Sequence, residues 1–95
     1  MIRQTNTKEL VLEDLTQGNR YALVITGADS AVELQFKHAG DATWRVMPDF
    51  DGTLTDVIRG DFFCFTPTMK LVFADAPAEG VTYYVSCIPF TASQF

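Results

Sequence analysis

The sequence predicts an all-β protein: a single small antiparallel β-sandwich of about eight strands, jelly-roll or immunoglobulin-like in kind. Apolar residues recur with a period of two, for example where Val32, Leu34 and Phe36 alternate with polar residues. This alternation is typical of a strand with one face in the core. Turn residues interrupt such runs about every ten residues, and no segment combines helical periodicity with caps. Short strands without crossover helices favour two stacked antiparallel sheets.

The strands are expected in the order in which the alternating runs occur. The run at residues 20–26 is apolar on both faces, which predicts a central strand, and the run at 81–89 has one apolar face. The segment from Thr7 to Leu15 carries the nearest helical signal, but it is too short to outweigh the β pattern. The predicted strands cover residues 8–13, 20–26, 32–38, 43–47, 53–59, 62–66, 69–74 and 81–89.

The chain of 95 residues has the length of one domain. The expected organisation is a flexible N-terminal arm at residues 1–9, a sandwich domain at 10–90 and a C-terminal tail at 91–95. The arm and the tail are polar enough to lie outside the core, and they are expected to become ordered only in contact with a neighbouring subunit. Hydrophobic residues make up 47% of the chain and include eight Phe. This apolar load exceeds what so small a core needs, which predicts contact with a partner subunit.

Composition also argues against several kinds of partner. The net charge is −5, and the seven basic residues are scattered, so no nucleic-acid interface is expected. No apolar run approaches the roughly 20 residues of a membrane helix, so no membrane association is expected. The first nine residues contain no apolar signal segment. Cys64 and Cys87 are therefore expected as thiols of a reducing compartment, with a disulfide between them as the alternative.

Residues 49–56 have the sequence DFDGTLTD, which matches the nucleophile motif DxDGTxxD of the haloacid-dehalogenase phosphatases. By this resemblance, Asp49 would be the nucleophile and Asp51 the acid/base. The surroundings argue against it, because that family has a parallel sheet whose crossovers need more chain than follows the motif. A turn explains the same residues: Pro48 fixes φ, Asp bonds back to the backbone and Gly52 supplies a positive φ. A calcium site is the third alternative, although the spacing differs from that of an EF-hand loop.

The other candidate residues do not form a recognisable catalytic or metal-binding set. His38 is the only histidine and is expected in a surface turn. Trp44, Tyr83 and Tyr84 offer aromatic rings on which a sugar could stack, whereas a place in the core is the alternative for Trp44. The sequence thus assigns no catalytic, cofactor-binding or metal-binding residue, and the protein is not expected to be an enzyme.

One arrangement of motifs resembles a known group of proteins. A strand at residues 32–37 is followed by Gly-Asp-Ala-Thr-Trp at 40–44, a strand Met-Lys-Leu-Val-Phe at 69–73 and a last strand that ends near Pro89. This pattern, over roughly residues 20–90, resembles small β-sandwich virion proteins of tailed bacteriophages. The resemblance implies a capsid decoration (cement) protein that binds the major capsid protein or other virion subunits, often as a homotrimer.

The same resemblance implies a place in the virion, after assembly in the host cytoplasm. The terminal arms and the surplus aromatic residues are the expected contacts, with Phe50, Phe90 and Phe95 as candidates. Affinity would then come from many weak contacts repeated over one lattice. The alternative function is a carbohydrate- or receptor-binding β-sandwich module of a phage tail or fibre, which would use Trp44 or Tyr84.

Overall fold

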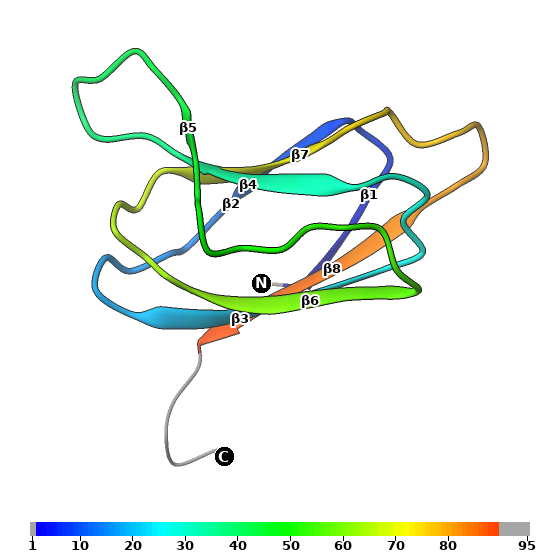
Figure 1. The fold of residues 1–95 in the computed structure, drawn as a ribbon, viewed down its shortest axis with the longest axis horizontal. Coiled ribbons are helices and arrows are strands. Elements are labelled where there is room, and N and C mark those ends of the chain that lie inside the picture. The colour runs from blue at the N-terminus through cyan, green and yellow to red at the C-terminus, as the bar shows by residue number, and fades with distance from the viewer. Residues whose placement is uncertain (1, 90–95) are drawn as a thin grey trace.

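The computed structural model describes residues 2–89, which form eight β-strands and no helix. Every strand pair is antiparallel, so the predicted all-β antiparallel sandwich is confirmed. The described residues accordingly contain no helix that could cross a membrane. In chain order (Figure 1) the strands are β1 (Ile2–Thr5), β2 (Glu9–Leu12), β3 (Arg20–Thr26), β4 (Val32–Phe36), β5 (Arg45–Val46), β6 (Val57–Phe63), β7 (Met69–Phe73) and β8 (Tyr83–Pro89).

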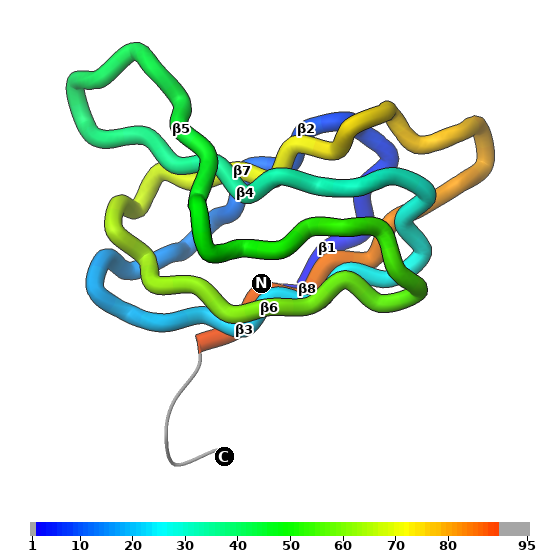
Figure 2. The backbone as a smooth tube through the Cα atoms, in the orientation of Figure 1, coloured from blue at the N-terminus to red at the C-terminus, as the bar shows by residue number. Residues whose placement is uncertain are grey.

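The eight strands form two four-stranded sheets, seen as the lower and upper layers in Figure 1. The first sheet has the order β1-β8-β3-β6, and the second has the order β2-β7-β4-β5. The chain therefore pairs β1 with β8, β2 with β7, β3 with β6 and β4 with β5, as a long hairpin rolled over itself (Figure 2). This nested pairing is the jelly-roll arrangement rather than the immunoglobulin-like one.

The core lies between the two sheets and follows the period-two pattern. In β3, the buried residues Tyr21, Leu23 and Ile25 alternate with residues that are half-buried on the outer face. The central position predicted for this strand is correct, because β3 lies between β6 and β8. The largest fully buried side chains come from both sheets: Tyr83, Phe73, Leu23, Ile25, Leu34, Ile58, Met69, Leu71, Val85, Cys64 and Cys87.

Strand β6 corrects the prediction of two strands at residues 53–59 and 62–66. It runs from Val57 through Gly60 and Asp61 to Phe63, and it pairs with β3 along its whole length. Gly60 and Asp61 suggested a turn, but they lie opposite Leu23 and Ala22 in a regular ladder. The glycine is used for packing, because a Cβ there would lie 3.2 Å from the ring of Phe50.

The N-terminal segment also differs from its prediction. Residues 1–9 were expected as an arm outside the core, but Ile2–Thr5 form β1 and pair with β8, and Glu9 begins β2. The polar composition was misleading because β1 is an edge strand that buries only Thr5, which is 8% exposed. The predicted C-terminal tail at residues 91–95 lies outside the described residues.

Candidate binding face

The candidate functional site is the outer face of the first sheet, the side that points away from the core. It carries large apolar side chains in exposed positions: Ile2 is 82% exposed, Tyr84 51% and Ile88 43%. Ile2 lies opposite Ser86 on β8, and Gln4 lies opposite Tyr84, so the first and last strands build this face together. A concentration of apolar surface on one face of a small domain indicates a place of contact with another molecule.

A shallow hollow of about 260 Å³ lies within this face. Apolar residues of β1, β3 and β8, among them Ile2 and Tyr84, line it together with polar ones. Arg3 is the one charged residue among those that line it, so its composition suits an apolar side chain of a partner more than a highly charged small molecule. Its lining residues are Ile2, Arg3, Gln4, Val24, Thr26, Tyr84, Val85 and Ser86.

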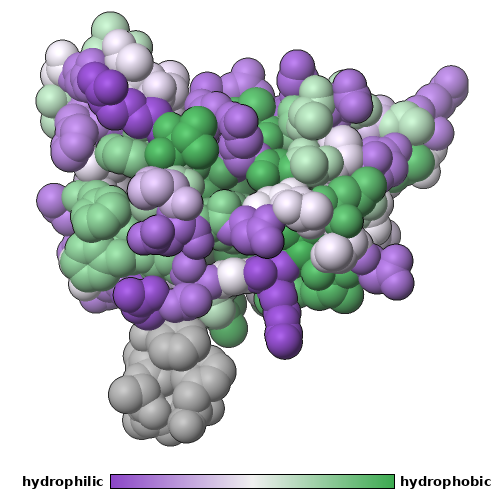
Figure 3. Space-filling model, viewed as in Figure 1, coloured by the Kyte–Doolittle hydropathy of each residue, from purple (hydrophilic) through white to green (hydrophobic). Residues whose placement is uncertain are grey.

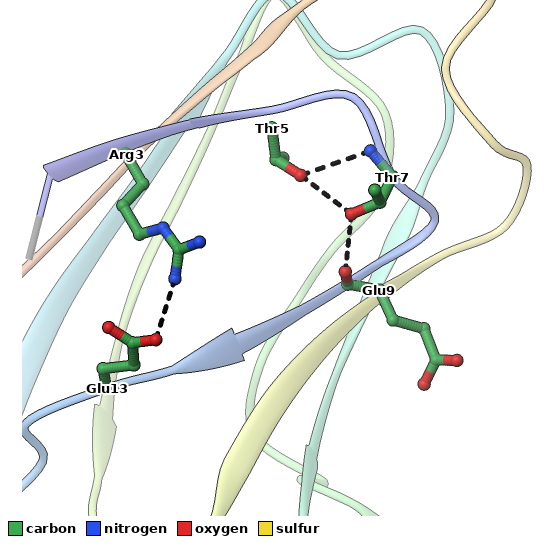
Figure 4. Close-up of polar contacts among 5 residues, drawn as sticks. All are labelled: Arg3, Thr5, Thr7, Glu9 and Glu13. Atoms are coloured by element: carbon green, nitrogen blue, oxygen red, sulfur yellow. Dashed lines mark hydrogen bonds and ion pairs between the residues drawn. The ribbon is translucent and has the colours of Figure 1, made fainter.

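Strand β1 is tied to the rest of the sandwich by the turn that follows it (Figure 4). The Oγ1 of Thr5 accepts a hydrogen bond of 3.2 Å from the backbone N–H of Thr7, and the hydroxyl of Thr7 donates to the carbonyl of Glu9 at 2.8 Å. Arg3 also forms an ion pair of 3.2 Å with Glu13, which follows β2. Together with the ladder to β8, these contacts connect β1 to the rest of the sandwich.

The outer face of the second sheet has a different chemistry. Glu9 and Lys70 form an ion pair of 2.5 Å across β2 and β7, and this interaction lowers the pKa of Glu9. The ammonium of Lys70 lies 4.4 Å from the centre of the Trp44 ring, and that of Lys37 lies 5.7 Å from it. Both distances suit a cation–π interaction. The most prominent aromatic ring near this sheet is therefore already occupied by cations of the same chain.

The three aromatic residues considered for sugar stacking do not form one platform. Tyr83 is fully buried and packs edge-on against Phe73. Its hydroxyl donates a hydrogen bond to the carboxylate of Asp29. Tyr84 lies on the outer face of the first sheet, and Trp44 lies beside the second sheet. Trp44 is half-buried and does not belong to the core, so the alternative prediction, which placed Trp44 in the core, is wrong.

The DFDGTLTD segment forms a connection between β5 and β6. Asp49, Asp51 and Asp56 are all exposed, and Asp51 accepts a hydrogen bond of 3.0 Å from the backbone N–H of Thr53. The Thr53 hydroxyl, and to a lesser degree this N–H, lowers the pKa of Asp51. The antiparallel fold has no place for the parallel sheet of the phosphatases. Among residues 2–89, no group of three or more His, Cys, Asp or Glu is placed to hold a metal ion.

Gly52 has a different role from the one predicted for it. It does not have a positive φ, unlike Gly18, Gly27, Gly40 and Gly80. Its carbonyl accepts a hydrogen bond of 3.0 Å from the N–H of Val32, and a Cβ at this position would lie 1.7 Å from the carbonyl oxygen of Val32. The position requires glycine because two backbone segments meet there.

The remaining candidates are a histidine and two thiols. His38 is exposed, and its carbonyl accepts the N–H of Asp41 in a turn, as predicted. Cys64 and Cys87 are both buried and present as thiols. The Cys64 thiol donates a hydrogen bond to the carbonyl of Thr66 at 2.9 Å, and burial raises its pKa. Burial also raises the pKa of Cys87 to about 11.

The raised pKa of Cys87 predicts a loss of stability at high pH. The thiol titrates near 9 in the unfolded chain and near 11 in the folded one, so its neutral form stabilises the fold fully below pH 9. This contribution falls as the pH rises from 9 to 11. In urea unfolding, the difference in stability between the wild type and Cys87→Ala should therefore narrow over this range. A difference that stays constant between pH 8 and 11 would contradict the assignment.

The outer face of the first sheet thus combines exposed apolar side chains and a shallow hollow at β1 and β8 with the Arg20–Asp61 ion pair at β6. The outer face of the second sheet carries the Glu9–Lys70 ion pair beside the exposed Val11. Sequence reasoning placed the expected contacts in terminal arms, whereas the structure places β1 within a sheet and pairs it with β8. Phe50 packs against the core and is half-buried, so it is not the exposed contact that was expected. Phe90 and Phe95 lie outside the described residues. Comparison with protein-family models, with curated proteins and with solved structures gave no match.

Proposed function

We propose that this chain is a structural virion protein that binds a bacteriophage capsid and stabilises or decorates it. The observation that supports the proposal is the apolar outer face of the first sheet, which exposes Ile2, Tyr84 and Ile88. The major capsid protein is the expected partner, with other virion subunits as further partners, and copies of the chain are expected to associate with one another. No part of this role requires turnover.

The physical basis of the binding is the burial of this face. Covering a side chain such as Ile2 or Ile88 contributes about 1.5–3 kcal/mol when it becomes fully buried. Part of this gain is lost to the entropy of association, so one contact of this size is weak by itself. On a capsid the same contact recurs many times. If copies are linked to one another, the effective concentration of the next copy becomes high, and weak contacts suffice.

The fold is compatible with this role and with its alternative. Jelly rolls occur both in viral capsid domains and in lectins, so the fold supports a binding module of either kind by analogy. A carbohydrate- or receptor-binding module of a tail or fibre remains the alternative. Its support is weaker because the three candidate rings lie apart: Tyr84 is on the outer face of the first sheet, Tyr83 is in the core, and two lysines lie over the Trp44 ring.

The proposal predicts that the wild-type protein co-sediments with capsids that were assembled without it. Ile2→Asp and Tyr84→Asp should each weaken this binding by about tenfold or more, because each places a charge on the apolar face. Val11→Asp is the matched control, since Val11 is 56% exposed on the outer face of the second sheet. Circular dichroism checks that all variants remain folded.

Two outcomes would count against this function. Equal binding by the wild type and the Ile2 and Tyr84 variants would remove the face from the contact. Absence of wild-type binding at any salt concentration, together with specific binding to a glycan array, would instead favour the carbohydrate-binding alternative.

A further inference from the structure

Strand β6 is an open edge of the first sheet. It has seven residues, whereas the other edge strands β1, β2 and β5 have four, four and two. Its pairing with β3 runs without a bulge from the Arg20–Phe63 pair to the Thr26–Val57 pair. The strand also contains no proline. It thus lacks two of the features that prevent an edge from pairing with another strand, a bulge and a proline, and its charged residues are Arg59 and Asp61.

The backbone groups at this open edge can be identified from the ladder. The N–H of Cys64 donates to the carbonyl of Asn19 at 2.9 Å, and the carbonyl of Cys64 accepts the N–H of Gly18 at 2.9 Å. The groups of Cys64 therefore face β3. Because the direction alternates along a strand, the even-numbered residues of β6 face β3 and the odd-numbered residues face outward. The open edge then presents the N–H and C=O groups of Arg59, Asp61 and Phe63. It also presents the N–H of Val57, whose carbonyl accepts a hydrogen bond of 2.7 Å from the Thr55 hydroxyl.

The sequence of β6 is complementary to itself when it is read in the opposite direction. Around Gly60, the strand reads apolar, apolar, Arg, Gly, Asp, apolar, apolar. A second copy placed antiparallel about a two-fold axis at Gly60 sets Arg59 opposite Asp61. The same axis sets Val57 opposite Phe63 and Ile58 opposite Phe62. Opposite charges and matched apolar residues in directly facing positions are the pairs that stabilise an antiparallel ladder.

We propose that two copies of this chain pair antiparallel through β6, about a two-fold axis at Gly60. The two four-stranded first sheets would then continue into one sheet of eight strands. In this register the hydrogen-bonded pairs between the two copies are Arg59 with Asp61 and Val57 with Phe63. These are the odd-numbered residues, whose backbone groups face the open edge. Backbone direction and side-chain complementarity therefore select the same register.

The side chains at this edge are available for such a contact. Arg59 is exposed and takes part in none of the ion pairs found in the described part of the chain. Asp61 bonds Arg20 through one carboxylate oxygen, which leaves its other oxygen for Arg59 of the second copy. Val57 is 47% and Phe63 40% exposed, so their mutual burial adds to the pairing. Figure 3 shows hydrophobic and hydrophilic residues mixed on the side of the sandwich along which β6 runs.

The contact goes beyond capsid binding and has a definite stoichiometry. An interface in which the same strand meets itself about a two-fold axis closes at two copies. It therefore predicts a dimer, with twice the 10.6 kDa mass of one chain, instead of the trimer that the resemblance implied. It also leaves the face around Ile2 free, because β1 is the opposite edge of the sheet.

Charge reversal tests the register. Arg59→Asp places like charges opposite each other at two symmetric positions, and Asp61→Arg does the same with positive charges. Each variant alone should be monomeric at concentrations where the wild type is dimeric, with a dissociation constant raised by about tenfold or more. An equimolar mixture of the two variants restores both opposite-charge pairs and should form a heterodimer. Arg45→Asp, an equal charge change on β5 of the second sheet, is the control and should remain dimeric.

Native mass spectrometry of the full chain, without capsids, measures these species, so the outcome is independent of the proposed function. Hydrogen exchange adds a second readout: amides of Arg59 and Asp61 should gain protection as the protein concentration rises, whereas that of Gly60 is already protected by β3. Heterodimer formation also shows that both variants are folded. A monomeric or trimeric wild type, or dimers in both single variants, would overturn the proposal.

Discussion

Replacing Phe73 by alanine is expected to cost about 3–5 kcal/mol of folding stability, because it removes one of the largest fully buried side chains of the core. Phe73 is fully buried in β7 and meets Tyr83 of β8 edge-on, with 4.6 Å between the ring centres. This pair joins the two sheets directly. Removing the ring leaves a cavity between the sheets, which their hydrogen-bonded ladders prevent from closing.

A small domain has little stability to lose. Natural proteins are stable by about 5–15 kcal/mol, so this substitution removes a large share of the total. Urea unfolding followed by circular dichroism measures the loss. Val72→Ala is the matched control, because Val72 is the neighbour of Phe73 on the same strand but points outward and is only half-buried. The loss of unfolding free energy for Val72→Ala should be smaller than that for Phe73→Ala by at least about 2 kcal/mol, the contribution of roughly one buried side chain. Equal losses would show that Phe73 has no special place in the core.

The alternation of apolar residues was sufficient to predict the fold class and the central strand. Strand β3 occupies Arg20–Thr26, which is the predicted range, and the period-two pattern of Val32, Leu34 and Phe36 lies in β4. Such patterns are reliable because the two faces of a strand meet different environments, and burial selects the residues on each. The pairing order was not predictable in the same way. It depends on contacts between segments far apart in the chain, such as β1 with β8.

The errors have a common physical cause: local residues were interpreted without their neighbours. Gly60 and Asp61 have turn propensity, but pairing with β3 keeps them in a strand. The segment Ile2–Thr5 looks like a polar arm, because an edge strand that buries one residue has no apolar alternation. In both places the tertiary contact determines the structure, and the sequence within the segment does not show it.

The candidate binding face was outside the reach of sequence reasoning for the same reason. Ile2 and Tyr84 are 82 positions apart, and only the pairing of β1 with β8 brings them to one face. Within residues 81–89, by contrast, the alternation already grouped Tyr83 with the apolar residues and Tyr84 with the polar ones, and in the structure Tyr83 is buried and Tyr84 exposed. A signal was nevertheless present in the sequence: the surplus of apolar residues over the needs of a small core correctly indicated exposed apolar side chains.

Replacing Gly52 by alanine is expected to destabilise the fold by about 3 kcal/mol, at the upper end of the cost of overpacking a core. The added Cβ would lie 1.7 Å from the carbonyl oxygen of Val32, a distance at which backbone must move. The movement would break the hydrogen bond from the N–H of Val32 to the carbonyl of Gly52. It would also shift Phe50, which precedes Gly52 by two residues and packs against the core.

The control for this substitution is Gly40→Ala. Gly40 has a φ of +81° and open space where its Cβ would lie, so alanine there meets only backbone strain of roughly 1–2 kcal/mol. Thermal or urea unfolding of both variants separates the steric clash at Gly52 from the backbone strain at Gly40. A loss of stability for Gly52→Ala no larger than that for Gly40→Ala would contradict the close approach of Gly52 to Val32. In this chain Gly52 lets the β5–β6 connection lie against the start of β4, where two backbone segments meet.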